Sequence, residues 1–180
     1  MRFIFAALLL LITVGAVEVA SAETPEELTT QCQKGNAAAC SDLGYMYYDG
    51  GGVTQDFFKA VELFRKACDG QNAEACFNLG LMYANGRGVT QDSFKAVKFY
   101  RKACDAQEAM GCFNLGVMYH DGTGVTQDSF KAVALYRKAC DAQIAAACFN
   151  LGLMYDNGTG VRLSVEDALK FLGTVIKGTP

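Results

Sequence analysis

The chain has 180 residues, of which 51% are hydrophobic and 19% are charged, so it can build a folded core and is not expected to be disordered. Its formal net charge is −3 and its lysines and arginines form no cluster, which argues against nucleic acid or an anionic membrane surface as a partner. It contains eight cysteines but a single histidine, His120. Residue types that enzymes and metal sites commonly use are therefore scarce, and the cysteines are the most informative feature.

Residues 1–22 have the pattern of a secretory signal peptide. Arg2 precedes an apolar run from Phe3 to Val17, and a small-x-small cleavage site, Ala20-Ser21-Ala22, follows it. A retained membrane anchor is the alternative, but the run is shorter than the roughly 20 apolar residues that span a bilayer. We therefore expect a mature chain that begins near Glu23, is exported to the periplasm or secreted, and has no stable membrane insertion after cleavage.

The cysteines follow a strict rhythm that extends to the rest of the sequence. Intervals of 8 and 28 residues alternate and define a period of 36. Glycine, tyrosine and alanine recur with the same period, and residues 68–103 match residues 104–139 at 26 of 36 positions. Such self-similarity is typical of a repeat protein.

Within one 36-residue unit, the hydrophobic pattern predicts two helices. The first covers about residues 73–84, where apolar side chains recur every three or four positions before glycines that end the helix. The second covers about residues 92–105, with Asp92 at its start and cationic side chains near its end. Such pairs bury their apolar faces only by stacking, so the sequence predicts an all-α, right-handed α/α superhelix, or solenoid.

The repeat divides the mature chain into a half-helix cap and four units. The cap covers residues 25–36, and the repeats cover about 37–72, 73–108, 109–144 and 145–180. A last helix is expected from about Ser164 to Lys177, with Ile176 at the position where a cysteine would recur. No cysteine is therefore left over after the fourth repeat.

The spacing also predicts how the cysteines pair. Eight residues of continuous helix rise about 12 Å, whereas the Cα atoms of bridged cysteines lie roughly 4.4–6.8 Å apart. A bridge across this spacing needs a break in the helix, which Gly70, Gln71 and Asn72 supply in one unit. Free thiols, a zinc site and other connectivities are the alternatives. The expected local bridges are Cys32–Cys40, Cys68–Cys76, Cys104–Cys112 and Cys140–Cys148.

The segment from Ala75 to Cys104 resembles the Sel1-like repeat, a relative of the tetratricopeptide repeat (TPR), through the pattern A-C-x2-L-G-x-M-Y-x2-G-x-G-V-x2-D-x2-K-A-x3-Y-x-K-A-C. With its Cys-x7-Cys pairs and signal peptide, the chain is similar to the secreted Helicobacter cysteine-rich protein family from about Glu26 to Lys177. This resemblance implies a superhelix stapled by disulfides. For function it implies contacts with host or envelope partners, or alternatively penicillin binding or weak β-lactamase activity.

The hydrolase alternative has no catalytic pattern behind it. The Ser-x-x-Lys, Ser-Asp-Asn and Lys-Thr-Gly motifs of serine β-lactamases are absent. Ser93 and Ser129 stand in Ser-Phe-Lys, where the lysine faces away from the serine on a helix. His120 is expected at an exposed helix end, and one histidine with eight paired cysteines cannot supply a catalytic metal site. We therefore expect no cofactor, no metal and no catalytic residue of a recognisable kind, and we favour a chain that is not an enzyme.

A binding function has more support, because one polar position recurs on the predicted first helices. In the related TPRs this position lines the concave face and hydrogen-bonds the backbone of an extended peptide, and an Asn side chain offers both a donor and an acceptor. We expect a monomer that binds a protein, a peptide or a cell-envelope component there. The alternative is that these side chains only bond the neighbouring repeat. The predicted ligand-binding residues are Asp42, Asn78, Asn114 and Asn150, with Glu74, Met110 and residues 144–146 tuning specificity.

Two further rows of residues are interpreted as structural. The tyrosines and methionines that recur on the first helix are expected in the core because of their helical spacing. The lysines of the second helix are expected to form a solvated face or to pair with aspartates three positions earlier, rather than to form a binding stripe. These rows are Tyr47, Tyr83, Tyr119 and Tyr155; Met46, Met82, Met118 and Met154; and Lys59, Lys95 and Lys131 with Asp56, Asp92 and Asp128.

Overall fold

The computed structural model describes residues 23–160, and all regular secondary structure in this part of the chain is helical. The all-α prediction is confirmed. The predicted signal peptide and the predicted helix over residues 164–177 lie outside the described residues. The helices are α1 (Pro25–Gln33), α2 (Ala37–Asp49), α3 (Phe57–Asp69), α4 (Ala73–Asn85), α5 (Ser93–Asp105), α6 (Ala109–Asp121), α7 (Ser129–Asp141) and α8 (Ala145–Asp156).

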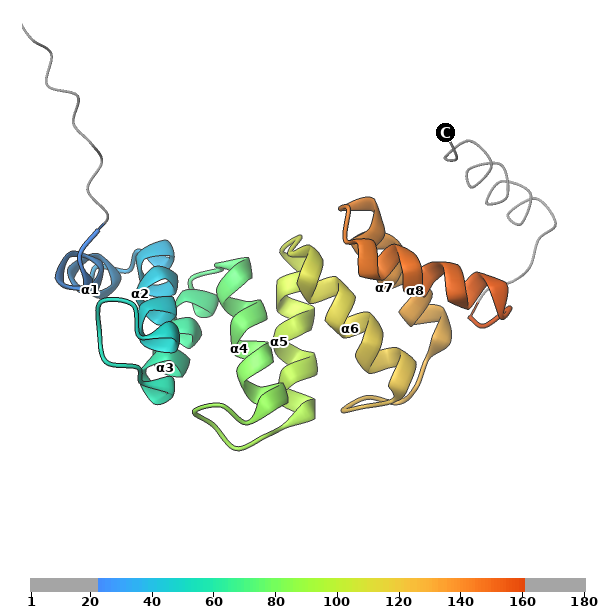
Figure 1. The fold of residues 1–180 in the computed structure, drawn as a ribbon, viewed down its shortest axis with the longest axis horizontal. Helices are drawn as coiled ribbons and strands as arrows, with labels where there is room; N and C mark the ends of the chain where they lie inside the picture. The colour runs from blue at the N-terminus through green and yellow to red at the C-terminus, as the bar shows by residue number, and fades with distance from the viewer. Residues whose placement is uncertain (1–22, 161–180) are drawn as a thin grey trace, which may run out of the picture.

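Each helix packs against the helices that precede and follow it in the sequence. Figure 1 shows the resulting row of helix pairs, with α1 at one end and α8 at the other. This arrangement is the predicted solenoid. The first helices of the four repeats are α2, α4, α6 and α8, and we call the side that they line the first-helix face; α3, α5 and α7 are second helices.

Polar side chains begin α1 to α7, and glycines in a left-handed conformation end the first helices α2, α4 and α6. The side chain of Asp92 accepts a hydrogen bond from the backbone N–H of Lys95, and Asp56 and Asp128 begin α3 and α7 in the same way. The predicted ion pairs form beside these caps, with Nζ–Oδ2 distances of 4.0, 3.2 and 2.9 Å along the chain. Gly50, Gly86 and Gly122 end α2, α4 and α6 with left-handed φ values of 68° to 79°.

The two helices of a repeat approach closely because a glycine on the first helix faces an aromatic ring on the second. A Cβ atom on Gly80 would lie 2.6 Å from the Tyr100 ring, and one on Gly116 would lie 2.8 Å from Tyr136. The alanine at the matching position of each second helix is fully buried, as Ala96 shows. These small residues therefore set the spacing of the helices.

Four disulfides join each repeat to the element before it, in the predicted local pairs. The bridged Cα atoms are 4.5 to 4.6 Å apart, which a continuous helix does not allow. The break between Cys68 and Cys76 contains Gln71 with a left-handed φ of 66°, and Gly35 takes this role in the first bridge. Each short closed loop stabilises the fold by about 2.5 kcal/mol through the entropy of the unfolded chain.

The recurring tyrosines and methionines pack in the core as predicted, but to different depths: Tyr83, Met82 and Met154 are buried, and the other members of the two rows are partly buried against the core. The Tyr83 side chain is only 6% exposed and stacks on Phe99 with a centroid distance of 5.5 Å. Its hydroxyl accepts a hydrogen bond of 2.9 Å from Arg65 of the preceding repeat, and Arg101 donates to Tyr119 in the same way at 2.8 Å. Arg137 donates to Tyr155 as well, so Tyr83, Tyr119 and Tyr155 join neighbouring repeats.

The two sides of the solenoid differ in charge. The first helices contain no lysine or arginine, whereas α3, α5 and α7 carry every lysine and arginine in residues 23–160 except Lys34 and Arg87. The second helices also share a row of exposed phenylalanines, Phe58, Phe94 and Phe130. In the described part of the chain, none of the helices has the length and hydrophobicity needed to cross a membrane.

Candidate functional site: a pocket between the first two repeats

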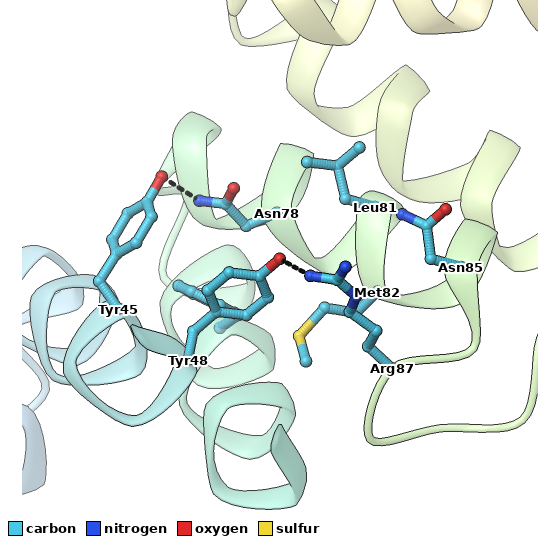
Figure 2. A pocket seen from close by; sticks show the side chains of 8 residues that line it. Tyr45, Tyr48, Asn78, Leu81, Met82, Asn85 and Arg87 are labelled. Atoms are coloured by element: carbon cyan, nitrogen blue, oxygen red, sulfur yellow. Dashed lines mark hydrogen bonds between the residues drawn. The ribbon is translucent and has the colours of Figure 1, made fainter. Parts of the chain in front are cut away.

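A pocket of about 130 Å³ lies between the first two repeats on the first-helix face. Figure 2 shows two tyrosines of α2 pointing toward side chains of α4 and of the loop that follows it. One ring of α3 completes the wall. The lining residues are Tyr45, Tyr48, Phe64, Asn78, Leu81, Met82, Asn85 and Arg87.

At one end of the pocket, Tyr45 connects the two repeats through its hydroxyl. The hydroxyl accepts a hydrogen bond of 2.7 Å from Nδ2 of Asn78 and donates one of 3.1 Å to Oε1 of Glu74. Burial raises the pKa of Tyr45, and the Asn78 hydrogen bond lowers it in part. The ring also contacts Phe64 edge to face, with centroids 5.3 Å apart. Tyr45 is therefore held in place by packing and by two polar partners.

At the other end, Arg87 lies against two aromatic rings. It donates a hydrogen bond to the Tyr48 hydroxyl, and its guanidinium carbon is 5.7 Å from the centroid of that ring and 5.9 Å from that of Phe57. Figure 2 shows this contact near the end of α4. Within residues 23–160, no carboxylate lies within ion-pair distance of Arg87. Its charge therefore faces solvent and pocket without a counter-ion from the described part of the chain.

The three predicted asparagines occupy one register position on α4, α6 and α8, and a tyrosine of the preceding repeat lies beside each of them. Asn78 is 9% exposed and pairs with Tyr45. Asn114 pairs with Tyr100, and Asn150 pairs with Tyr136. Each asparagine thus has a tyrosine partner in the preceding repeat, with a hydrogen bond shown for Asn78, and a role in ligand binding stays a prediction.

Asp42, the fourth predicted residue, differs from the asparagines. It is exposed on α2, which has only the half-helix cap before it. Its pKa is raised, first by partial burial and then by the nearby carboxylates of Glu23 and Glu74. Glu108 is also close enough to raise the pKa of Tyr45. Asp42 of α2, Glu74 in the first turn of α4 and Glu108 at the start of α6 therefore make the end of the pocket opposite Arg87 acidic.

Sequence reasoning missed Tyr45, Tyr48 and Arg87, because it used the positions that recur. These three residues break the repeat: the corresponding residues of the next unit are Leu81, Ala84 and Thr123. The sequence could have identified these pocket residues through positions at which one repeat differs from the others.

A second pocket, of about 350 Å³, lies at the same place between the third and fourth repeats. Every residue that lines the first pocket has its counterpart 72 positions later in the lining of the second. Here Val117 and His120 replace the two tyrosines, and Thr159 replaces Arg87. As predicted, His120 is exposed at a helix end, where its Nδ1 is 2.8 Å from Oδ1 of Asp121.

The first pocket contains no serine, cysteine or lysine that could act as a nucleophile or its base. Residues 23–160 also hold no group of three His, Cys, Asp or Glu residues suited to a metal ion. The lining offers aromatic and aliphatic surface, two phenol hydroxyls, two amides and one guanidinium, groups that can bind a ligand by apolar contact and hydrogen bonds.

The Sel1 repeat family model matches residues 37–72, 73–107, 109–143 and 145–173, which is most of the chain. A similar solved structure is a protective antigen of uropathogenic Escherichia coli with an SLR fold, at 36% identity and a TM-score of 0.75 over 78% of this chain and 30% of that chain. A Sel1 repeat protein from Oxalobacter formigenes has a TM-score of 0.75 at 24% identity, over 87% of this chain and 64% of that one. Helicobacter pylori cysteine rich protein B has 30% identity and a TM-score of 0.56, over 72% of this chain and 98% of that one.

No curated protein sequence matches the chain. The chain spans about a third of the length of the E. coli antigen and about two thirds of that of the Oxalobacter protein, so the activities of those whole proteins do not transfer directly. The matched repeats, the helix pairs and the disulfides between them agree with one another. The chain belongs to the Sel1 repeat family.

Proposed function

We propose that this chain is an exported interaction scaffold that binds an extended segment of a partner protein on its first-helix face. Sel1 repeats are typical of protein–protein interaction. The observation that carries the proposal is the pocket that recurs at the same inter-repeat position 72 residues later, with an asparagine in the lining both times. A pair of pockets along one face suits a ligand that extends across several repeats.

The asparagines would contribute through their oxygens. Nδ2 of Asn78 is occupied by Tyr45, and in the described part of the chain its Oδ1 has no hydrogen-bond partner. An amide oxygen in this position accepts a backbone N–H, a contact that depends little on peptide sequence. Specificity would then come from the residues that differ between the pockets, such as Tyr48 and His120.

Charge favours a basic segment. The first helices carry aspartate and glutamate but no lysine or arginine, so their field attracts cationic ligands. The four disulfides indicate an oxidising compartment. With the predicted signal peptide, they support a scaffold in the periplasm or outside the cell, where the partner would be a secreted protein or an envelope component. The scaffold would act as a monomer.

A phage-displayed library of random decapeptides, selected against the mature disulfide-bonded chain, tests the proposal. We expect selected peptides to lose binding to Leu81→Glu and to Leu153→Glu, because each change places a charge in a pocket. The matched control is Ala134→Glu, which adds the same charge on the exposed side of α7 and reproduces the residue that the first repeat has at that position, Glu62.

Circular dichroism and a count of free thiols establish that each variant is folded. Binding that survives both pocket substitutions, or that Ala134→Glu removes equally, would place the ligand elsewhere and contradict the proposal. Failure to select any peptide would contradict it as well.

A further inference from the structure

We infer that the pocket between α2 and α4 receives the C-terminal residue of a peptide, with the terminal carboxylate on Arg87 and an aliphatic side chain among Tyr45, Phe64 and Leu81. The inference rests on the proposed function and names the chemistry of the partner segment. It applies to the first pocket only, because Arg87 is the one lysine or arginine in the lining of either pocket.

Arg87 is prepared to bind a carboxylate. Its guanidinium has five N–H donors in a planar fork, and the Tyr48 hydroxyl accepts from Nη1. The rings of Tyr48 and Phe57 lie against it and restrict its conformations before a ligand binds, so binding would cost less conformational entropy. No carboxylate of residues 23–160 competes for it. A paired hydrogen bond to a carboxylate is among the strongest that a protein side chain makes.

The size and lining of the pocket fit one medium-sized apolar side chain. Its volume is about 130 Å³, close to that of engineered apolar cavities of roughly 150 Å³ that bind benzene. Aromatic and aliphatic side chains supply most of the wall, including Tyr45, Phe64, Leu81 and Met82. A leucine side chain has suitable size and chemistry, and burying it on binding contributes through the hydrophobic effect.

The polar groups along α4 set the direction of the peptide. Asn78, Leu81 and Asn85 lie along α4 and Arg87 follows its end (Figure 2). The rise from residue 78 to residue 85 is about 10 Å, which is the length of about three extended residues. With the carboxylate on Arg87, the chain would run back past Asn78 toward the acidic Glu74. A basic residue of the peptide, upstream of its C-terminus, is favoured near Glu74. The terminal carboxylate lies at the opposite end of the pocket, away from the acidic side chains.

N-acetyl-alanyl-leucine and its C-terminal amide, titrated into the mature disulfide-bonded chain and followed by NMR, test the inference. The two probes share every atom of the acyl part and the leucine side chain and differ in the terminal charge. We expect the acid to bind roughly tenfold more tightly than the amide, because only the acid forms a charge-assisted pair of hydrogen bonds with Arg87. Binding should change the chemical shifts of Leu81 and Met82. Arg87→Gln should reduce the affinity for the acid to that for the amide.

Arg101→Gln is the matched control, because Arg101 also donates to a tyrosine hydroxyl but lies on α5 outside the pocket lining. Equal affinities for acid and amide, an equal loss in Arg101→Gln, or no saturable shift with either probe would overturn the inference. The proposed function fails separately, since it depends on whether Leu81→Glu and Leu153→Glu block selected decapeptides. Selected peptides that need Leu81 but bind equally well with an amidated terminus would leave the scaffold function in place and remove the carboxylate site.

Discussion

The junction between the first and second repeats and the junction between the second and third each contain an asparagine–tyrosine pair, made by different residues. Asn78 donates to Tyr45, which lies on a first helix, whereas Asn114 pairs with Tyr100 on a second helix. Three register positions change together. Ser41, Tyr45 and Phe64 of the first repeat correspond to Phe77, Leu81 and Tyr100 of the second.

Both repeats have two aromatic rings and one tyrosine hydroxyl among these three positions, but the rings and the hydroxyl stand at different positions. Side chains fill the core at both junctions. In the second repeat, Phe77 packs on Tyr100 with ring centroids 6.1 Å apart. In the first repeat, Ser41 replaces that phenylalanine and the Tyr45 ring packs on Phe64 instead. An aromatic pair thus packs in the core of both repeats. At the surface the two repeats differ, because only the first places a tyrosine, Tyr45, in the pocket beside Arg87. Substitutions that the core accommodates therefore make the first junction chemically different from the second.

Ser41→Phe should have the largest effect. Ser41 is 2% exposed, so a phenylalanine there would overlap Tyr45 and Phe64 and lower the free energy of unfolding by about 3 kcal/mol. The triple variant Ser41→Phe, Tyr45→Leu, Phe64→Tyr, which copies the second junction, should recover most of this loss. Urea denaturation followed by circular dichroism measures both.

Ser41→Ala is the control for this series. The Ser41 hydroxyl has no hydrogen-bond partner in residues 23–160, so its removal should leave stability unchanged or slightly raised. A triple variant no more stable than Ser41→Phe would show that the three positions do not form one exchangeable unit.

The second-largest expected effect is a loss of stability at alkaline pH that comes from the second junction, because Tyr100 can ionise and the corresponding Phe64 of the first junction cannot. Burial raises the pKa of Tyr100 from 10.0 to about 12. Above pH 10 an unfolded tyrosine loses its proton while folded Tyr100 keeps it, so the free energy of unfolding falls as pH rises from about 10 to about 12. The expected loss is about 2 kcal/mol. Urea denaturation at a series of pH values measures it, with phenolate absorbance reporting ionisation.

Tyr100→Phe should flatten this part of the pH profile, although Tyr45 and Tyr136 also have raised pKa values and keep some slope. Identical slopes in the variant and the parent chain would mean that Tyr100 does not carry the effect.

Tyr45→Phe should have the smallest effect of the three, a loss of about 1 kcal/mol. The change leaves Nδ2 of the buried Asn78 without its acceptor. Phe64 offers no replacement hydroxyl, so adding Phe64→Tyr should restore stability by recreating the pair seen in the second junction. Thermal denaturation of the single and double variants measures this.

Tyr48→Phe is the matched control, since its hydroxyl bonds the exposed Arg87 and its loss should change stability by less than about 0.5 kcal/mol. An equal cost for both tyrosines would contradict the view that burial of the Asn78 bond distinguishes them.

Much of the fold could be predicted because it is local and repeated. The helix pair of residues 73–105, the caps at Asp56, Asp92 and Asp128, and the ion pairs beside them depend on residues within one or two turns. The disulfides could be predicted because the Cys-x7-Cys spacing allows a bridge only across a helix break. The recurring asparagines could be singled out from the sequence, and their role in ligand binding stays a prediction. Their partners could not be predicted, because Tyr45 and Tyr100 reach them from the preceding repeat.

The sequence by itself therefore determined the repeat, its two helices and its four cystine links, since a 36-residue period and short-range rules are enough to specify them. Only the tertiary structure decided which side chains meet between repeats. Arg87 reaches Tyr48 across 39 positions, and Asn78 reaches Tyr45 across 33. Such contacts depend on how consecutive repeats stack, a relation in space that neither periodicity nor helix propensity contains.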